Sequence, residues 1–423
     1  MLSLFDLAAL LLTASASFSW LNRRFLRLPH AIGLLTMGLA ASLLLVLVDL
    51  VAPGRHLYDA LTGTLRQIDF ADVLMNGMLA FLIFAGALNV DLAALRRRAV
   101  PVALLALLGT LISTVLVGLA AWLVSGWLAD LGIGPRLPLA WALVLGALIS
   151  PTDPVAVLST LRDVAVPASL EAEMKGEALF NDGVGIVLFT LLLRFATGRA
   201  GGDDALPQAL RLLAQEAGGG LLLGVLAGML AYRMMRAIDD FPAETLITLA
   251  LVTGSYALAQ RLHVSGPLAM VAAGLIIGDR GPRYAFSART NTYVCALWTL
   301  IDEILNAVLF LLIGLEVLVL GFDAALLPFA LALIPIVLGA RLIAITPPLL
   351  LIRWVEALTP RNLPFLTWAG IRGGISVALA LSVPEGPQKP ALLAATYAVV
   401  LFSILVQGGT LQAVARRTLR TEP

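Results

Sequence analysis

Apolar segments of about membrane-spanning length follow one another along the sequence, separated by short polar connections. An α-helix needs about 20 apolar residues to cross the hydrocarbon core of a bilayer. By this measure the pattern predicts thirteen transmembrane helices, near residues 4–20, 30–51, 69–90, 100–124, 138–161, 170–195, 208–235, 243–261, 264–279, 291–320, 324–352, 362–382 and 390–412. The predicted fold class is therefore all-α and integral to the membrane.

Composition supports this fold class and narrows the classes of function. Of the 423 residues, 60% are hydrophobic and 13% are charged, whereas soluble domains carry about 25% charged residues. The net charge of +1 gives no reason to expect a nucleic acid as a partner. One cysteine and three scattered histidines form no metal-binding pattern, and the sequence has neither a P-loop nor a G-x-G-x-x-G string. We therefore expect no cofactor, and we expect that the protein is not an enzyme.

Basic residues indicate which way the helices run. Most Lys and Arg lie after odd-numbered predicted helices and in the C-terminal tail, and basic connections tend to stay in the cytoplasm. This predicts an N-terminus outside the cell and a cytoplasmic C-terminus. The first helix is expected to be retained, because its arginines, beginning at Arg23, follow the apolar part instead of preceding it. Arg outnumbers Lys by 26 to 2, which is typical of a GC-rich bacterial genome and favours a bacterial inner membrane.

Two weak internal similarities suggest an inverted repeat. "IGLLTMGL" (32–39) resembles "LAMVAAGL" (268–275), and "LIFAGALNV" (82–90) resembles "FLLIGLEV" (310–317). Both pairs are seven predicted helices apart, and an odd offset reverses the direction of crossing. The alternative is chance similarity among segments rich in Leu, Ala and Gly.

The repeat divides the chain into two halves of six helices, near 4–195 and 243–412, joined by a linker helix near 208–235. Residues 1–412 would then form a single transmembrane domain, and 413–423 a short cytoplasmic tail. Secondary transporters share this organisation, with a binding site at the midplane on interrupted helices.

The fifth predicted helix contains such an interruption. The segment "ISPTDPV" (149–155) has two prolines, Pro151 and Pro154, which lack N–H donors and clash with the preceding turn. The helix should unwind near Thr152, and the freed carbonyl oxygens beside Asp153 would suit a small cation. The alternative is a proline kink in which Asp153 only caps the following half-helix.

The repeat requires a second interruption in the twelfth helix. Its sequence "TWAGIRGGISVALAL" (367–381) places Gly370, Gly373 and Gly374 around Arg372. Glycine adopts backbone conformations that other residues resist. We therefore expect this helix to break around Arg372.

The sixth predicted helix carries the densest group of polar residues, in "EMKGEALFNDGVGIVLF" (173–189). A charge at membrane depth costs several kcal/mol unless it is paired or hydrated. Glu177 and Asn181 share one face, whereas Asp182 lies about 140° around the helix from Glu177. We expect Asp182 to face a cavity and Glu177 to face a partner.

The expected partner of Glu177 is Arg372, the charged residue of the other interrupted helix. The alternative places Glu177 near the cytoplasmic interface beside Lys175. Asp302, Glu303 and Asn306 could line a path or cap a broken turn. Arg341 could pair or reach the interface, but the sequence gives none of these residues a transport role.

Four motifs together resemble the sodium/proton antiporters of the cation:proton antiporter superfamily, in particular those of the NhaP and NHE type. The motifs are "SPTDPVAV", "GEALFNDGVGIVLF", "FLLIGLEV" and "WAGIRGGISVALAL". The resemblance extends from about residue 20 to residue 412. It implies a membrane domain of thirteen helices in two inverted halves, and a homodimer.

The resemblance also implies residue roles. Asp182 would bind a cation and a proton alternately, with Asn181 as its neighbour. Thr152 and Asp153 would belong to the unwound crossing, with the Thr152 carbonyl facing the ion, and Glu177 would pair with Arg372. An Asn-Asp pair is similar to that of the electroneutral branch.

One position departs from the family. Many members have Ser directly after the glutamate, where this chain has Ala178. The preference among sodium, lithium and potassium therefore stays open.

The resulting hypothesis is exchange of a monovalent cation for a proton by competition at Asp182. Burial favours the neutral form of a carboxyl group, and a bound cation favours the charged form. The alternatives are an uncoupled channel or uniporter on the same scaffold, a sensor without transport, and an intramembrane protease that uses Asp153 and Asp182. The protease is disfavoured because the sequence lacks the G-x-G-D string expected of that class.

Overall fold

A computed structural model describes residues 4–51, 70–154, 157, 160–161, 166–198, 211, 214–317, 323–351 and 362–419. Within these ranges the chain consists of helices and their connections, with no strand. Nine of the described helical segments are long and apolar enough to cross a membrane. The predicted all-α membrane fold is therefore confirmed.

The first half of the chain contains α1 (Leu4–Leu21), η1 (Asn22–Leu26), α2 (His30–Val51), α4 (Phe70–Asp72), η2 (Val73–Met78), α5 (Leu79–Leu88), α6 (Leu92–Arg97), α7 (Ala99–Leu104), η3 (Leu105–Gly109), α8 (Thr110–Asp130), α9 (Leu139–Ile149) and α11 (Ala168–Ala196). The π-helical turns η2 and η3 continue the helices on either side of them, so α4–α5 and α7–α8 are each one crossing.

The second half contains η4 (Ala214–Gly218), α13 (Gly219–Arg236), α14 (Phe241–Leu262), α15 (Gly266–Arg280), η5 (Gly281–Ala285), α16 (Ala288–Glu316), η6 (Ala324–Leu326), α17 (Leu327–Leu351), α18 (Leu363–Trp368), α19 (Gly374–Leu381), α20 (Lys389–Phe402), η8 (Ser403–Gly408) and α21 (Gly409–Thr418). The helix α21 extends past residue 412, so the predicted tail at 413–423 is helical as far as Thr418. Residues 420–423 lie outside the described part.

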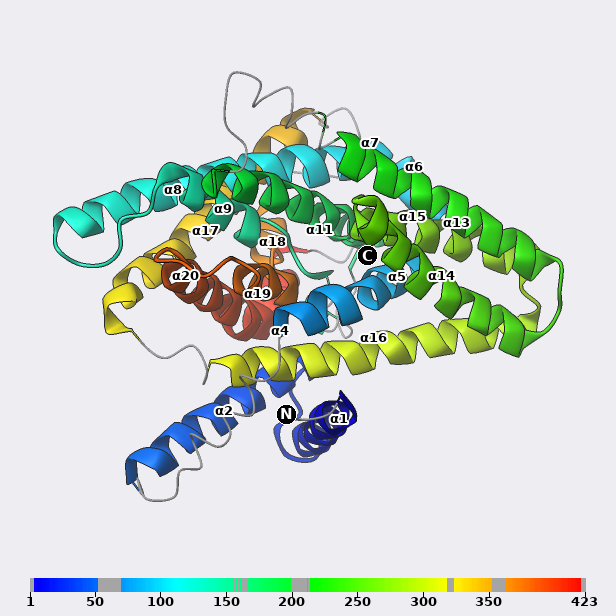
Figure 1. Ribbon diagram of the computed structural model, residues 1–423, viewed down its shortest axis with the longest axis horizontal. Coiled ribbons are helices and arrows are strands. Elements are labelled where there is room, and N and C mark those ends of the chain that lie inside the picture. Colours follow the sequence, from blue (N-terminus) through cyan, green and yellow to red (C-terminus); the bar gives the residue numbers. More distant parts are fainter. Residues whose placement is uncertain are drawn as a thin grey trace.

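The helices pack in two groups that meet at α11. One group contains α2, α5 and α13 to α16, and the other contains α8, α9, α17, α19 and α20. The helix α11 contacts α9 in one group and α15 in the other. Figure 1 shows α16 crossing the molecule, with α1 and α2 on one side of it and α5, α18 and α19 on the other.

Small residues allow the closest helix contacts, as is usual in membranes. In α9, Gly146 lies against the main chain of Thr114 in α8, where a Cβ atom would collide with the carbonyl oxygen. Gly38 and Gly314 make a similar contact between α2 and α16. Because lipid tails give helices little hydrophobic reason to associate, close packing of this kind stabilises the bundle.

Both predicted interruptions are present. The helix α9 ends at Ile149, and the chain is not helical from Pro151 to Asp153. The helix α18 ends at Trp368, and α19 begins at Gly374. The two breaks meet where the N–H of Asp153 donates to the carbonyl oxygen of Ile371, at 2.8 Å.

Candidate functional site

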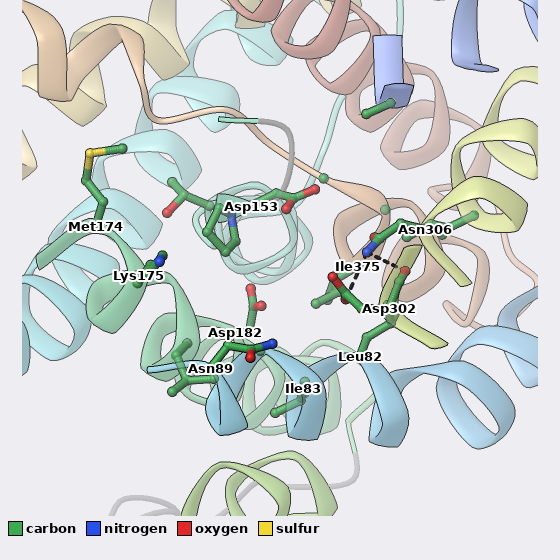
Figure 2. Close-up of a pocket in the computed structure, with 18 of the residues that line it drawn as sticks. Leu82, Ile83, Asn89, Asp153, Met174, Lys175, Asp182, Asp302, Asn306 and Ile375 are labelled. Atoms are coloured by element: carbon green, nitrogen blue, oxygen red, sulfur yellow. Dashed lines mark hydrogen bonds between the residues drawn. The ribbon is translucent and has the colours of Figure 1, made fainter. Parts of the chain in front are cut away.

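A cavity of about 770 Å³ lies beside the two breaks, between α5, α11 and α16. Its wall includes Pro151 to Pro154 from the first break and Gly373 to Ser376 from the second. Figure 2 shows Asp153, Asp182 and Asp302 approaching it from three different parts of the chain. Glu171 and Glu303 also line it, so acidic side chains outnumber the basic Arg23 and Lys175, and the space attracts cations.

Asp182 projects from α11 into this cavity. In the described part of the chain, no hydrogen bond or ion pair ties its carboxylate to another side chain. The charged group that acts on it most directly is a second carboxylate, Asp153. An acid in this position can be neutralised by a proton or by a small cation.

Asn181 fixes the first break from behind the cavity wall. Its side chain is 1% exposed and donates from Nδ2 to Thr152 Oγ1, at 2.8 Å. Thr152 lines the cavity, whereas Asn181 does not. Asn181 therefore positions the unwound segment that faces Asp182.

The freed carbonyl groups of the breaks have identifiable partners. Arg372, which is 1% exposed, donates from Nη1 to the carbonyl oxygens of Ser150, at 3.0 Å, and Pro151, at 3.4 Å. Gln407 donates from Nε2 to the carbonyl oxygen of Trp368, at 2.9 Å. These contacts give hydrogen-bond partners to irregular backbone, which is tolerated at membrane depth only where protein or water satisfies it.

The predicted ion pair between Glu177 and Arg372 is wrong. Both oxygens of Glu177 accept from Arg341 of α17, Oε1 from Nη1 and Oε2 from Nη2, the latter at 3.0 Å. The two charges are buried, and the planar guanidinium matches the carboxylate in two parallel bonds. Arg372 instead donates hydrogen bonds to carbonyl groups of the first break. The break leaves these carbonyl groups without helical partners, and the charged guanidinium supplies donors for them.

Arg341 is thus a site residue that the sequence left without a role. The available signal was its location in an apolar segment, since a charge at that depth needs a partner. The sequence favoured Arg372 because it lies in the other interrupted helix, whereas the packing of the helices brings Arg341 to Glu177.

The three glycines of the second break allow close packing, and none of them has the positive φ angle that favours glycine. Positive φ angles occur at other described glycines, such as Gly132, but not at Gly370, Gly373 or Gly374. A Cβ atom at Gly373 would collide with the side chain of Asp153. Gly370 lies against Arg341, and Gly374 against a leucine of α16. The prediction that these glycines adopt special backbone conformations is therefore wrong. They are needed because neighbouring groups approach them too closely for a side chain.

Asp302 is another residue to which the sequence gave no role. It lines the cavity from α16, and Asn306 donates from Nδ2 to its Oδ1, at 3.0 Å, and to its carbonyl oxygen, at 2.9 Å (Figure 2). The i, i+4 spacing of two polar residues in an apolar helix was the only signal. Ala178, in contrast, is buried and does not line the cavity.

A family comparison decides what kind of protein has this site. The profile of the family described as "Sodium/hydrogen exchanger, transmembrane" matches residues 10–417. The chain belongs to the sodium/hydrogen exchanger family. As a family member it is a multi-pass membrane protein, and the resemblance drawn from the motifs is confirmed.

Individual relatives and a solved structure are similar to this exchanger over most of the chain. The Na(+)/H(+) antiporter NhaP of Pseudomonas aeruginosa is 43% identical over 427 residues, which cover 99% of this chain and 98% of the relative. The antiporter NhaH of Halobacillus dabanensis is 35% identical and covers 74% of this chain and 75% of its own. The structure of the sodium proton antiporter MjNhaP1 from Methanocaldococcus jannaschii has the same fold, with a TM-score of 0.73, 19% identity and 98% of each chain covered.

Proposed function

We propose that this exchanger is a secondary antiporter that moves Na⁺ in one direction and H⁺ in the other, by competition of the two ions for Asp182. The family supports this function, as do relatives whose names describe Na(+)/H(+) antiporters. The observation that carries the proposal is the placement of Asp182. Its carboxylate faces a cavity at the crossing of two helix breaks, without a paired side-chain cation among the described residues.

Competition follows from the electrostatics of a buried acid. Burial favours the protonated form, and a cation beside the carboxylate favours the charged form, so the two ligands exclude each other. The protein changes the side to which the cavity opens only when one of them neutralises Asp182. A bare carboxylate would be too costly to carry through the low-dielectric part of the bundle.

The surrounding residues have supporting roles in this mechanism. Asp153 and Asp302 raise the local concentration of cations, and Thr152 supplies oxygen ligands, among them its carbonyl group. Asn181 is neutral and holds Thr152 in place. In this mechanism Asp182 is the acid that exchanges its proton for the cation, so one cation exchanges for one proton and the exchange is electroneutral. Sodium is the proposed substrate, and lithium and potassium are the cations to compare with it.

The proposed architecture is a single domain over residues 1–412 that crosses the membrane thirteen times in two inverted halves. Nine of these crossings correspond to continuous described helices. The remaining four are α1, the short α15 and the two interrupted helices. We place the N-terminus outside and the C-terminus in the cytoplasm of a bacterium, and we expect a homodimer.

Transport in everted membrane vesicles tests this function. A pH gradient is formed, and recovery of the fluorescence of a pH-sensitive dye is followed after addition of sodium, lithium or potassium. The proposal expects cation-dependent recovery that is lost in Asp182→Asn, with equal amounts of protein in the membrane. Recovery that persists in Asp182→Asn, or cation flux without proton movement, contradicts it.

A further inference from the structure

A lysine and a glutamate lie on the same face of α11 as Asp182. Glu171, Lys175, Leu179 and Asp182 all line the cavity, at steps of three and four residues that follow one side of a helix. Lys175 precedes Asp182 by two turns, about 10 Å along the axis. Figure 2 shows Lys175 and Asp182 beside the same space. The cavity that would receive a mobile cation is therefore already lined by the ammonium group of Lys175.

Glu171 holds this ammonium group away from Asp182. Lys175 Nζ lies 2.7 Å from Glu171 Oε1, and Glu171 is one turn further toward the beginning of the helix. The pair therefore draws the ammonium in the direction opposite to Asp182. The two side chains are 32% and 41% exposed, and an ion pair as accessible as this one is weak. The ion pair between Lys175 and Glu171 can therefore break while α11 stays helical.

A lysine ammonium resembles the ions that the site would bind. It is a compact monovalent cation on a flexible stem. Released from Glu171, it would turn toward the nearest carboxylates of the cavity and lower their attraction for a mobile cation. The chain has only two lysines, and one of them is at this position.

We propose that Lys175 is a built-in competitor of the transported cation and that Glu171 sets the cation affinity by holding the ammonium back. This inference rests on the proposed function, because it assigns a specificity-determining role at the same cavity. It concerns the affinity for the cation and not the maximal rate, which other residues set.

The test is the KM and Vmax for sodium in everted vesicles at one fixed pH. Glu171→Gln should raise the KM about three- to tenfold, because a full positive charge moves several ångströms toward the site. Lys175→Gln should lower the KM about twofold or more, because a competing charge is removed. The double variant should behave like Lys175→Gln. Vmax should stay within about twofold in all three, because a competitor weakens binding without changing the rate of the loaded protein.

Lys389 and Glu385 provide a matched control. They form an ion pair with the same i, i+4 spacing and the same 2.7 Å distance, but neither residue lines the cavity. Glu385→Gln should leave the KM for sodium unchanged. Lys175→Arg keeps the charge and should keep the KM close to that of the unmodified protein, which separates loss of charge from damage to the helix.

Three results overturn the inference. A double variant that keeps the raised KM of Glu171→Gln shows that Glu171 does not act through Lys175, and a raised KM in Lys175→Gln shows that the ammonium does not compete. Asp182→Asn in the same vesicles separates this inference from the proposed function. Transport that survives in Asp182→Asn ends the proposed function, whereas its loss together with unchanged KM values at 171 and 175 ends only the inference.

Discussion

The main-chain N–H of Asp153 donates a 2.8 Å hydrogen bond to the carbonyl oxygen of Ile371. This bond joins the two helix breaks, which come from opposite halves of the sequence. Arg372, next to Ile371, donates to the carbonyl oxygens of Ser150 and Pro151. Each break thus supplies partners for the polar backbone that the other exposes, so neither can unwind at membrane depth without the other.

The close approach of the breaks predicts a strong effect of Gly373→Ala. The added methyl group would collide with the side chain of Asp153 and push the breaks apart. We expect transport to fall at least about tenfold, because small displacements in a preorganised site have large effects. Gly339→Ala is the control, since nothing lies within 4 Å of a Cβ atom there. Normal vesicle transport by Gly373→Ala would show that the spacing of the breaks is not critical.

The buried pair between Glu177 and Arg341 predicts a loss of stability. Glu177→Gln leaves a buried guanidinium without its counter-charge, and loss of one partner of a buried pair costs about 3–5 kcal/mol. Thermal unfolding in detergent should show a lower midpoint for this variant. The double variant Glu177→Gln with Arg341→Gln should recover part of the loss, because the guanidinium that lost its counter-charge is removed as well. A single variant with an unchanged midpoint would argue against this pair as a structural contact.

The hydrogen bond from Asn181 to Thr152 predicts a defect in cation affinity. Asn181→Ala removes the only described side-chain donor to Thr152 Oγ1, and a lost buried hydrogen bond costs about 1–3 kcal/mol. The KM for sodium should rise about five- to tenfold or more in everted vesicles. Thr152→Ser keeps the hydroxyl group and should have a much smaller effect. Equal KM values for Asn181→Ala and the unmodified protein would contradict the positioning role.

Competition at one acid predicts the direction of the pH dependence. Protons and cations exclude each other at Asp182, so the apparent KM for sodium should rise as the pH falls. Where the acid is mostly protonated, the rise approaches about tenfold per pH unit, as for any one-proton competition. Vmax at saturating sodium should change much less over the same range. The measurement is a sodium titration at several pH values, and a KM independent of pH would exclude simple competition.

Local features of the sequence predicted the helices and the breaks. Apolar length is a local property, and prolines such as Pro151 and Pro154 interrupt a helix wherever it lies. The cavity-facing position of Asp182 followed from helical periodicity, because Glu177 and Asp182 cannot share a face.

Local sequence patterns could not predict which side chains pair between helices that are distant in the sequence. The sequence favoured Arg372 as the partner of Glu177, because Arg372 is the charged residue of the other interrupted helix. Only the packing of α17 against the bundle selects Arg341 instead. Asp302 depends in the same way on how α16 is turned toward the cavity. The glycines around Arg372 correctly predicted the position of the break. Their role in close packing could not be predicted, because it depends on side chains of other helices that lie against them.

Proton release on sodium binding tests the central claim most directly. Purified protein in a weakly buffered detergent solution is titrated with sodium while a pH indicator reports released protons. Competition at Asp182 predicts the release of up to one proton per chain at a pH where Asp182 is protonated, and none from Asp182→Asn. Sodium binding without proton release, or equal release from Asp182→Asn, would contradict it.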